Sequence, residues 1–221
     1  MITWSKPTPT RAPGLREVVD VGIGIADAEG LPAVSMRRVA TALRSGTASL
    51  YRIVESREEI VERMVDAVLG EAIPAPAGGD WRADLSALAR NRRALFRRHP
   101  WLGAELAGRP AIGPNALSHH EHALAAVAGL TEDPTSASSA VETLLAYVLG
   151  AAARETAETQ RAGLGESEWR AEVAPYLAEV IDGYPRLRRM MREAEDFGPD
   201  DRFERGLTCV LDGIAGQCGP R

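Results

Sequence analysis

A short stretch near residue 50 combines small side chains with strong hydrogen-bond donors. Thr47, Ala48 and Ser49 are small or polar, and Tyr51 and Arg52 follow them closely. A helix can enter a DNA major groove, roughly 12 Å wide, only if its outward side chains let the backbone come close. The hydroxyl of Tyr51 suits a phosphate, and the guanidinium of Arg52 suits a phosphate or a base edge. The stretch therefore predicts a helix that reads duplex DNA.

Three more arginines stand close enough in the sequence to join such a surface. Arg37 and Arg38 lie early in the preceding helical segment and could reach the same groove or its rim. Arg57 lies at a predicted helix N-terminus, where a cation opposes the helix macrodipole. A phosphate held at that N-terminus would explain this unfavourable placement. We therefore expect all three arginines to contact DNA.

Capping residues and apolar spacing place these side chains on a run of short helices. Ser35 suits an N-cap, and Ser56 with Glu59 has the spacing of a capping box. The Glu29-Gly30 step ends the first helix. The expected helices run from Leu15 to Glu29, Met36 to Leu43, Thr47 to Ile53 and Arg57 to Gly70. Because none of them buries much surface alone, they must pack together as a three-helix helix-turn-helix unit with a longer helix attached.

The charge distribution fits a small DNA-reading face. The net charge of −5 argues superficially against a nucleic-acid partner, but its distribution matters more. Residues 1–70 carry nine basic and nine acidic side chains, whereas residues 71–221 carry 17 basic and 22 acidic ones. Residues 11–57 carry seven arginines and five acids. The chain should touch DNA locally and should not coat it non-specifically.

The rest of the chain is also predicted to be helical, so the fold class is all-α. Residues 1–14 read as a flexible arm, residues 15–70 as the helix-turn-helix domain, and residues 71–79 as a Pro- and Gly-rich linker. Residues 80–221 form a larger helical domain, and no alternating strand pattern occurs in it. Its expected helices cover about residues 80–99, 101–107, 116–128, 134–162, 167–181, 185–195 and 200–216.

Residues 15–69 resemble the DNA-binding domain of the tetracycline-repressor (TetR) family through EGLPAVSMRRVATAL and SLYRIVESREEIVERMVDAVL. A weaker likeness to the C-terminal domain of the tetracycline-repressor subgroup extends through DWRADL, RHPWL, GPNAL, AYVLGAA and FERGLTCVLDGI. The resemblance implies a helix-turn-helix domain joined to a larger helical domain that binds a ligand and dimerises.

The same resemblance assigns roles to individual residues. It implies that Arg37 reads a guanine and that Thr47 and Ser49 lie on the recognition helix. It also implies that Tyr51 and Arg57 contact the DNA backbone.

The turn between the two short helices departs from the family pattern. Family members usually read Leu-Gly-Val-Ser, whereas this chain reads Leu43-Arg44-Ser45-Gly46. Glycine there serves a backbone with positive φ. Either Arg44 adopts that conformation, or the turn shifts by a residue or two and Gly46 takes over part of the role. Ile53 also replaces a usual histidine, which removes one potential phosphate donor.

Two C-terminal segments, residues 139–153 and 203–216, are apolar over more of their circumference than a monomer surface tolerates. The resemblance implies that they pair with their symmetry mates in a homodimer, whose two heads, about one DNA turn apart, would read a palindrome. The alternative is an intramolecular core. The candidate interface residues are Val141, Leu144, Leu145, Val148, Leu149, Ala152, Phe203, Leu207, Val210, Leu211 and Ile214.

The resemblance also implies an effector pocket in the C-terminal helices, although no single residue identifies the ligand. Aromatic residues could line this pocket or could be ordinary core and interface residues. These residues are Trp81, Phe96, Trp101, Tyr147 and Trp169.

The histidines and cysteines do not form a metal-site pattern. The four histidines are His99, His119, His120 and His122. His119 and His122 can share a helical face, but no carboxylate or cysteine spacing completes a site. His99 suits a helix-terminal cation or a packing residue. Cys209 and Cys218 are expected to be free thiols, and we expect no metal and no cofactor.

Together, these features predict a cytoplasmic, homodimeric transcriptional regulator. We expect it to be a repressor that binds a palindromic operator and is released from it by a small-molecule effector. Residues 57–70 would act as a lever between the two domains. No nucleophile–base pair, acid pair or phosphate loop is visible, so no enzyme is expected. The alternative is a metabolite-binding helical protein or enzyme whose helix-turn-helix no longer reads DNA. We find no secretory signal, and the apolar run at 140–153, broken by Glu142, is too short to span a bilayer.

Overall fold

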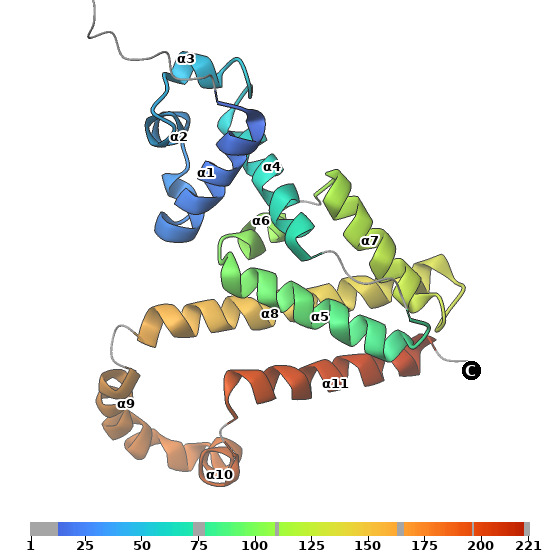
Figure 1. The fold of residues 1–221 in the computed structure, drawn as a ribbon. Coiled ribbons are helices and arrows are strands. Elements are labelled where there is room, and N and C mark those ends of the chain that lie inside the picture. Colours follow the sequence, from blue (N-terminus) through green and yellow to red (C-terminus); the bar gives the residue numbers. More distant parts are fainter. Residues whose placement is uncertain (1–12, 73–77, 109–110, 163–165, 196, 219–221) are drawn as a thin grey trace, which may run out of the picture.

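The computed structural model describes residues 13–72, 78–108, 111–162, 166–195 and 197–218, and within these ranges it is helical without strands (Figure 1). The all-α prediction is therefore confirmed. The helices are α1 (Leu15–Glu29), α2 (Met36–Ala42), α3 (Thr47–Leu50), α4 (Arg57–Leu69), α5 (Trp81–Arg98), α6 (Leu102–Gly108), α7 (Pro114–Val127), α8 (Pro134–Ala162), α9 (Glu166–Val180), α10 (Pro185–Glu193) and α11 (Pro199–Cys218). Short 3-10 turns lie at Leu31–Ala33, Gly70–Ala72 and Ile181–Gly183.

Helices α1 to α4 form a small unit, here called the head, around a core of branched side chains. Val18 on α1 is fully buried, as are Ile60 and Met64 on α4. A side chain at Gly22 would come within 2.7 Å of the Met64 sulfur, so the glycine lets α1 and α4 pack closely. The head thus has its own core, which fixes the surface that α2 and α3 present.

Serine caps begin two of the head helices, as the sequence predicts. The Ser35 hydroxyl accepts the N–H of Arg38 at 3.2 Å, and the Ser56 hydroxyl accepts the N–H of Glu59 at 3.2 Å. The Glu59 carboxylate accepts the N–H of Glu55 at 2.6 Å instead of that of Ser56. Of the two hydrogen bonds of the predicted capping box, the one accepted by the serine hydroxyl is confirmed. The one accepted by the glutamate comes from the N–H one residue earlier than predicted.

The turn between α2 and α3 has a positive φ at Arg44, where the usual family pattern has glycine. Arg44 has φ of 51° and is the only non-glycine residue with positive φ in the described ranges, whereas Gly46 has φ of −82°. The N–H of Arg44 bonds to the carbonyl of Thr41, and that of Ser45 bonds to the carbonyl of Ala40. These two bonds form a Schellman motif, so Arg44 takes the glycine conformation and Gly46 does not.

Helix α3, the expected recognition helix, is shorter than the sequence predicts. α3 ends at Leu50, and residues 51–53 form a turn instead of continuing to Ile53. Because a single helical turn is not stable alone, α3 depends mainly on packing against the neighbouring helices of the head to hold its position.

Helices α5, α8 and α11 run side by side, with α7 crossing near one end (Figure 1); these four are here called the bundle. Leu85 and Leu95 on α5 pack into a common core with apolar residues of α8 and α11. Helices α9 and α10 extend away from the bundle in the same view and expose several large apolar side chains. The exposed residues are Tyr176, Tyr184, Leu187, Met190 and Met191.

This packing corrects the assignment of eight candidate interface residues, which are at most 4 % exposed within a single chain. They are Val141, Leu144, Val148, Ala152, Phe203, Leu207, Leu211 and Ile214. These residues already fill the core between α5, α8 and α11. They therefore fit the alternative interpretation, in which the two segments form an intramolecular core. Leu145, Leu149 and Val210 are only partly buried and keep some surface for a partner.

Within the described residues, one helix is long and apolar enough to cross a membrane by length and composition alone. It covers Pro134–Thr159 of α8 and has a mean hydropathy of 1.2. Its apolar side chains pack against α5 and α11, which is the behaviour of a bundle helix.

Candidate DNA-binding surface and its link to the bundle

Helix α3 turns one side chain inward and leaves the others at the surface. Leu50 is fully buried, whereas Thr47 and Ala48 are exposed and Ser49 is half-buried. Tyr51, directly after the helix, is 59 % exposed. The small outward side chains predicted from the sequence therefore share one accessible face, as groove entry requires.

The exposed arginines of the head differ in whether they are already paired. The guanidinium of Arg37 is exposed and has no polar partner within the described part of the chain, and the same is true of Arg44. Arg38 pairs with Glu29 at 2.5 Å, which raises the pKa of Arg38. Arg52 donates to the Ser49 hydroxyl at 3.3 Å. Arg37 and Arg44 are thus the cations most available to an added anion.

The side chain of Arg44 is a candidate DNA contact that the sequence does not suggest directly. From the sequence, Arg44 stands out only as a replacement for a backbone glycine. In the structure its side chain is exposed at the turn that leads into α3. A basic residue in the turn directly before the predicted DNA-reading helix is the sequence signal that could have identified it.

Arg57 is held differently from the sequence expectation. Its Nε donates to the carbonyl of Val34 at 2.7 Å, and its Nη2 donates to the carbonyl of Leu31 at 3.1 Å. These carbonyls belong to the short turn between α1 and α2. The cation at the start of α4 therefore satisfies backbone acceptors, and no phosphate is needed to explain its position.

Helix α4 is tied to α7 of the bundle by hydrogen bonds. The Asp66 carboxylate accepts the N–H groups of Asn115 and the following residue, each at 3.0 Å, which caps the start of α7. A side chain at Gly113 would overlap that carboxylate, so only glycine allows the approach. One turn further on, the ring Nε2 of His119 donates to the carbonyl of Leu69 at 2.6 Å. Burial lowers the pKa of His119, which favours the neutral ring.

A second link joins α1 to the segment between α5 and α6. One oxygen of Asp27 lies 2.8 Å from Nδ1 of His99 and accepts the indole N–H of Trp101 at 2.7 Å. The other ring nitrogen of His99 lies 3.2 Å from Glu71, just after α4. His99 is 3 % exposed, so it is a packing residue that also connects the head to the bundle. The described residues contain no group of three or more potential metal ligands.

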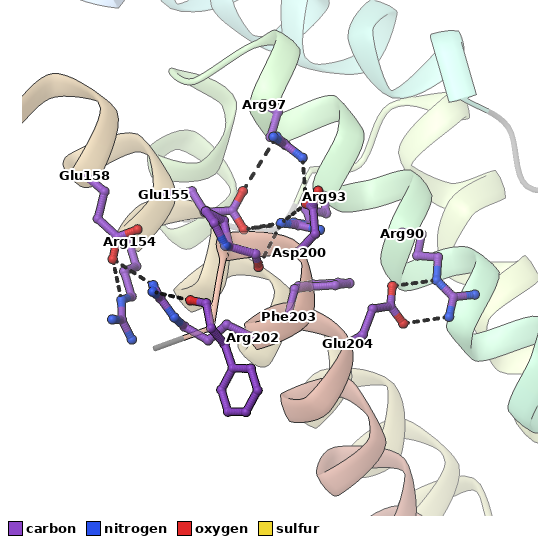
Figure 2. Close-up of polar contacts among 12 residues, drawn as sticks. Arg90, Arg93, Arg97, Arg154, Glu155, Glu158, Asp200, Arg202, Phe203 and Glu204 are labelled. Carbon is purple, nitrogen blue, oxygen red and sulfur yellow. Dashed lines mark hydrogen bonds and ion pairs between the residues drawn. The ribbon is translucent and has the colours of Figure 1, made fainter. Parts of the chain in front are cut away.

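Ion pairs join the bundle helices around Arg93 (Figure 2). Arg93 on α5 pairs with Glu155 on α8 at 2.6 Å and with Asp200 on α11 at 2.8 Å. Its guanidinium also lies 4.3 Å from the centre of the Phe203 ring. Arg93 is 7 % exposed, yet carboxylates and an aromatic face surround its charge. The sequence does not predict this cluster, because its members lie far apart in the chain.

The bundle has a hollow on either side of α8. One of about 620 Å³ lies between α7 and α8 and is lined in part by His120, Leu124 and Ser138. The other, of about 450 Å³, lies between α8 and α11 beside Tyr147, whose hydroxyl donates to the Phe203 carbonyl at 2.7 Å. Both volumes lie in the range of small-molecule sites.

The four candidate aromatic side chains that the structure describes do not gather in one pocket. Among these four, Tyr147 alone borders one of the two hollows, whereas Phe96 and Trp101 are buried in the core. Trp81 is half-buried beneath the guanidinium of Arg82. The side chain of Trp169 lies outside the described residues. Cys209 and Cys218 are free thiols, as expected.

Comparisons with known proteins agree with this architecture. Residues 73–218 match the family model described as tetracyclin repressor-like, C-terminal domain. The chain is 43% identical over 220 residues to the HTH-type transcriptional repressor DrrR1 of Streptomyces coeruleorubidus, covering 95% of this chain and 78% of that protein. It is 27% identical over 207 residues to the class A tetracycline repressor protein from transposon 1721 of Escherichia coli, covering 90% and 88%.

The solved structures show the same relationship. The Streptomyces coelicolor TetR family protein ActR in complex with actinorhodin superposes with a TM-score of 0.81 and 28% identity, covering 94% of this chain and 99% of that chain. With the helix-turn-helix geometry, the family match over most of the bundle and a curated repressor at 43% identity, the chain belongs to the TetR family of transcriptional regulators.

Proposed function

We propose that this protein is a homodimeric, cytoplasmic repressor that binds a palindromic operator and leaves it when a small-molecule effector enters the bundle. The observation that carries the proposal is the exposed face of α2 and α3, on which Arg37 has no partner and Thr47 and Tyr51 point outward. The names of two relatives support it: DrrR1 is a transcriptional repressor, and ActR has been solved with actinorhodin bound.

We divide the candidate DNA-binding residues into three groups. We assign base reading to Arg37, Thr47, Ala48 and Ser49, which lie on or next to the small outward face. Exposed donors at its edge contact phosphates. These donors are Arg44, Tyr51 and Arg52. Arg38 and Arg57, whose guanidiniums are already bonded within the head, act mainly by holding α2 in place.

Effector binding reaches the head through α4 in this proposal. α4 carries Arg57 at its head end and Asp66 and Leu69 at its bundle end. A shift of α7 would pull on the Asp66 cap and on the His119 hydrogen bond, and so would move α4. The coupling between effector and operator is typically about 1–3 kcal/mol in such systems.

The dimer surface is assigned to the outer faces of α8 and α11. Leu145, Leu149 and Val210 keep partial exposure there, and Gly150 borders the hollow between the two helices. Small residues at that position allow a partner helix to approach closely.

An unbiased DNA selection followed by gel-shift titration tests the proposal. We expect Arg37→Ala to weaken binding to the selected operator by about tenfold to a hundredfold and to relax the sequence preference at one base pair per half-site. The matched control is Arg16→Ala, an arginine of α1 whose side chain is 94% exposed and pairs only with Asp20. That control should bind the operator within about twofold of wild type.

Two results would contradict the proposal. If the wild-type protein retards no DNA fragment at low salt, the head does not read DNA, and the metabolite-binding alternative holds. If Arg37→Ala and Arg16→Ala bind alike, the face of α2 and α3 is not the reading face.

A further inference from the structure

Two neighbouring arginines of α5 are buried on different sides of the helix with opposite surroundings. Arg93 is 7 % exposed and Arg92 is 9 % exposed. Arg93 has two carboxylates, a backbone carbonyl and an aromatic ring around it. Arg92 has no hydrogen bond and no ion pair within the described part of the chain, and its Nε is fully enclosed. The sequence analysis did not single out either residue.

A guanidinium that is about nine-tenths buried, with an enclosed Nε that has no partner, is costly for the fold. A buried charge is normally paired, hydrogen-bonded or bound to a ligand, because its desolvation is otherwise uncompensated. Burial lowers the pKa of Arg92 to about 10, so the side chain is still a cation near pH 7. An isolated buried cation that keeps its charge is therefore ready for an anion that the chain itself does not supply.

The surroundings of Arg92 place this cation next to the contacts between α7 and α4. The charge of Arg92 reaches His119 on α7, where it helps to keep the ring neutral. The Nε2 atom of that ring donates to the carbonyl of Leu69 at the end of α4. The nearby carboxylate, Asp66, is already engaged by the N–H groups at the start of α7. An anion at Arg92 would thus bind beside the hydrogen bonds that hold α7 to α4.

We propose that Arg92 is the anion-binding residue of the effector site, and that the effector is a small aromatic or alicyclic molecule carrying a carboxylate. The planar guanidinium offers donors in the geometry that a carboxylate accepts. Leu88, Leu95 and Phe96 are buried residues about one turn from Arg92 on the same helix, and apolar side chains at that spacing suit a hydrocarbon ring. The inference rests on the proposed function only in taking this anion to be the effector.

The first test measures the free protein and needs no ligand. Arg92→Met keeps an unbranched apolar side chain and removes the guanidinium with its charge, so the Tm should rise by about 2–4 °C or more. The control is Arg90→Met, on the same helix and paired at the surface with Glu204, which should not raise the Tm. A fall in the Tm of Arg92→Met would show that the guanidinium stabilises the fold, and the proposal would be wrong.

The second test uses matched probes, 2-naphthoate and its neutral amide, in calorimetric titrations of the full-length dimer. Wild type should bind the acid about tenfold to a hundredfold more tightly than the amide. Arg92→Met should lose this preference, Arg92→Lys should keep part of it, and Arg90→Met should keep all of it. Equal affinity of wild type for the two probes, or no binding of either, overturns the assignment of Arg92.

A third measurement separates this inference from the proposed function. The same naphthoate is added to the complex of wild type with its selected operator, and release is followed by gel shift. Release that is lost in Arg92→Met supports both proposals. Charge-selective binding without release keeps the anion site and contradicts its role as the effector site, whereas release that persists in Arg92→Met contradicts the role of Arg92.

Discussion

The head and the bundle hold their charged side chains in different ways. In the head, most polar contacts join residues one turn apart, such as Ser56 with Glu59, and Glu59 with Arg63. In the bundle, Arg93 reaches Glu155 and Asp200, which lie 62 and 107 residues further along the chain. The head is therefore built from locally stabilised helices, whereas the bundle depends on buried charges that only the complete fold brings together.

The sharpest way to test this contrast is to remove a buried acid from the bundle. Glu155→Ala should lower the free energy of unfolding by about 3 kcal/mol, because Arg93 stays buried with one carboxylate fewer. Glu204→Ala removes the exposed partner of Arg90 and should cost less than about 1 kcal/mol. Urea unfolding at one fixed protein concentration measures both. Equal losses would mean that the buried cluster is no stronger than a surface pair.

Arg57, which joins the start of α4 to the turn between α1 and α2, should have the next largest effect on the free energy of unfolding. Arg57→Ala removes two charge-assisted bonds to the carbonyls of Val34 and Leu31, and we expect a loss of about 2 kcal/mol. Operator binding should weaken to the same degree on every sequence, because Arg57 holds α2 without reading bases. The control Arg16→Ala should leave both quantities unchanged. A normal unfolding free energy with weaker DNA binding would instead make Arg57 a direct phosphate contact.

The α2–α3 turn offers a change in the opposite direction. Arg44→Gly relieves a positive φ and should stabilise the protein by about 1 kcal/mol. Arg44→Ala keeps the strain and should leave stability nearly unchanged. Both variants lose the charge, so both should weaken operator binding by similar factors. If the two variants are equally stable, the positive φ at residue 44 does not destabilise the protein.

The smallest expected effect concerns pH and the contact between α7 and α4. Burial lowers the pKa of His119 below its ordinary value of 6.5, so the unfolded chain takes up the proton first. The stability from the neutral ring is present above pH 6.5 and is lost as the pH falls through the lower folded value. His119→Gln should unfold with a shallower dependence on pH than wild type between pH 7 and 5.5. Parallel curves would show that His119 does not titrate on unfolding.

The sequence predicts the head well because its signals are local. The serine caps and the Glu29-Gly30 stop each depend on neighbours within a few residues, so the residue types alone indicate them. The residue types leave open whether Arg44 or Gly46 takes part in the positive-φ turn, and the structure shows that Arg44 has the positive φ. The same reasoning overestimates α3, because apolar spacing continues to Ile53 while the backbone turns at Tyr51.

The bundle is predicted only in outline. Apolar stripes place its helices within a few residues, but they do not tell which helices share a core. Val141, Leu144 and Phe203 were therefore assigned to a partner chain when they in fact pack within their own. The pairing of Arg93 and the isolation of Arg92 depend on residues from distant helices, and adjacent arginines look alike in a sequence.

The short α3 has a consequence for how this regulator changes over generations. Leu50 is its only buried side chain, and the side chains of Thr47 and Ala48 are exposed and do not contribute to the core of the head. If Thr47 and Ala48 read bases as proposed, substitutions at these outward positions alter which operator is read while leaving the folded state as stable as before. After a gene duplication, two copies could therefore diverge toward different target genes at the cost of very few mutations, each keeping the same effector site and the same scaffold.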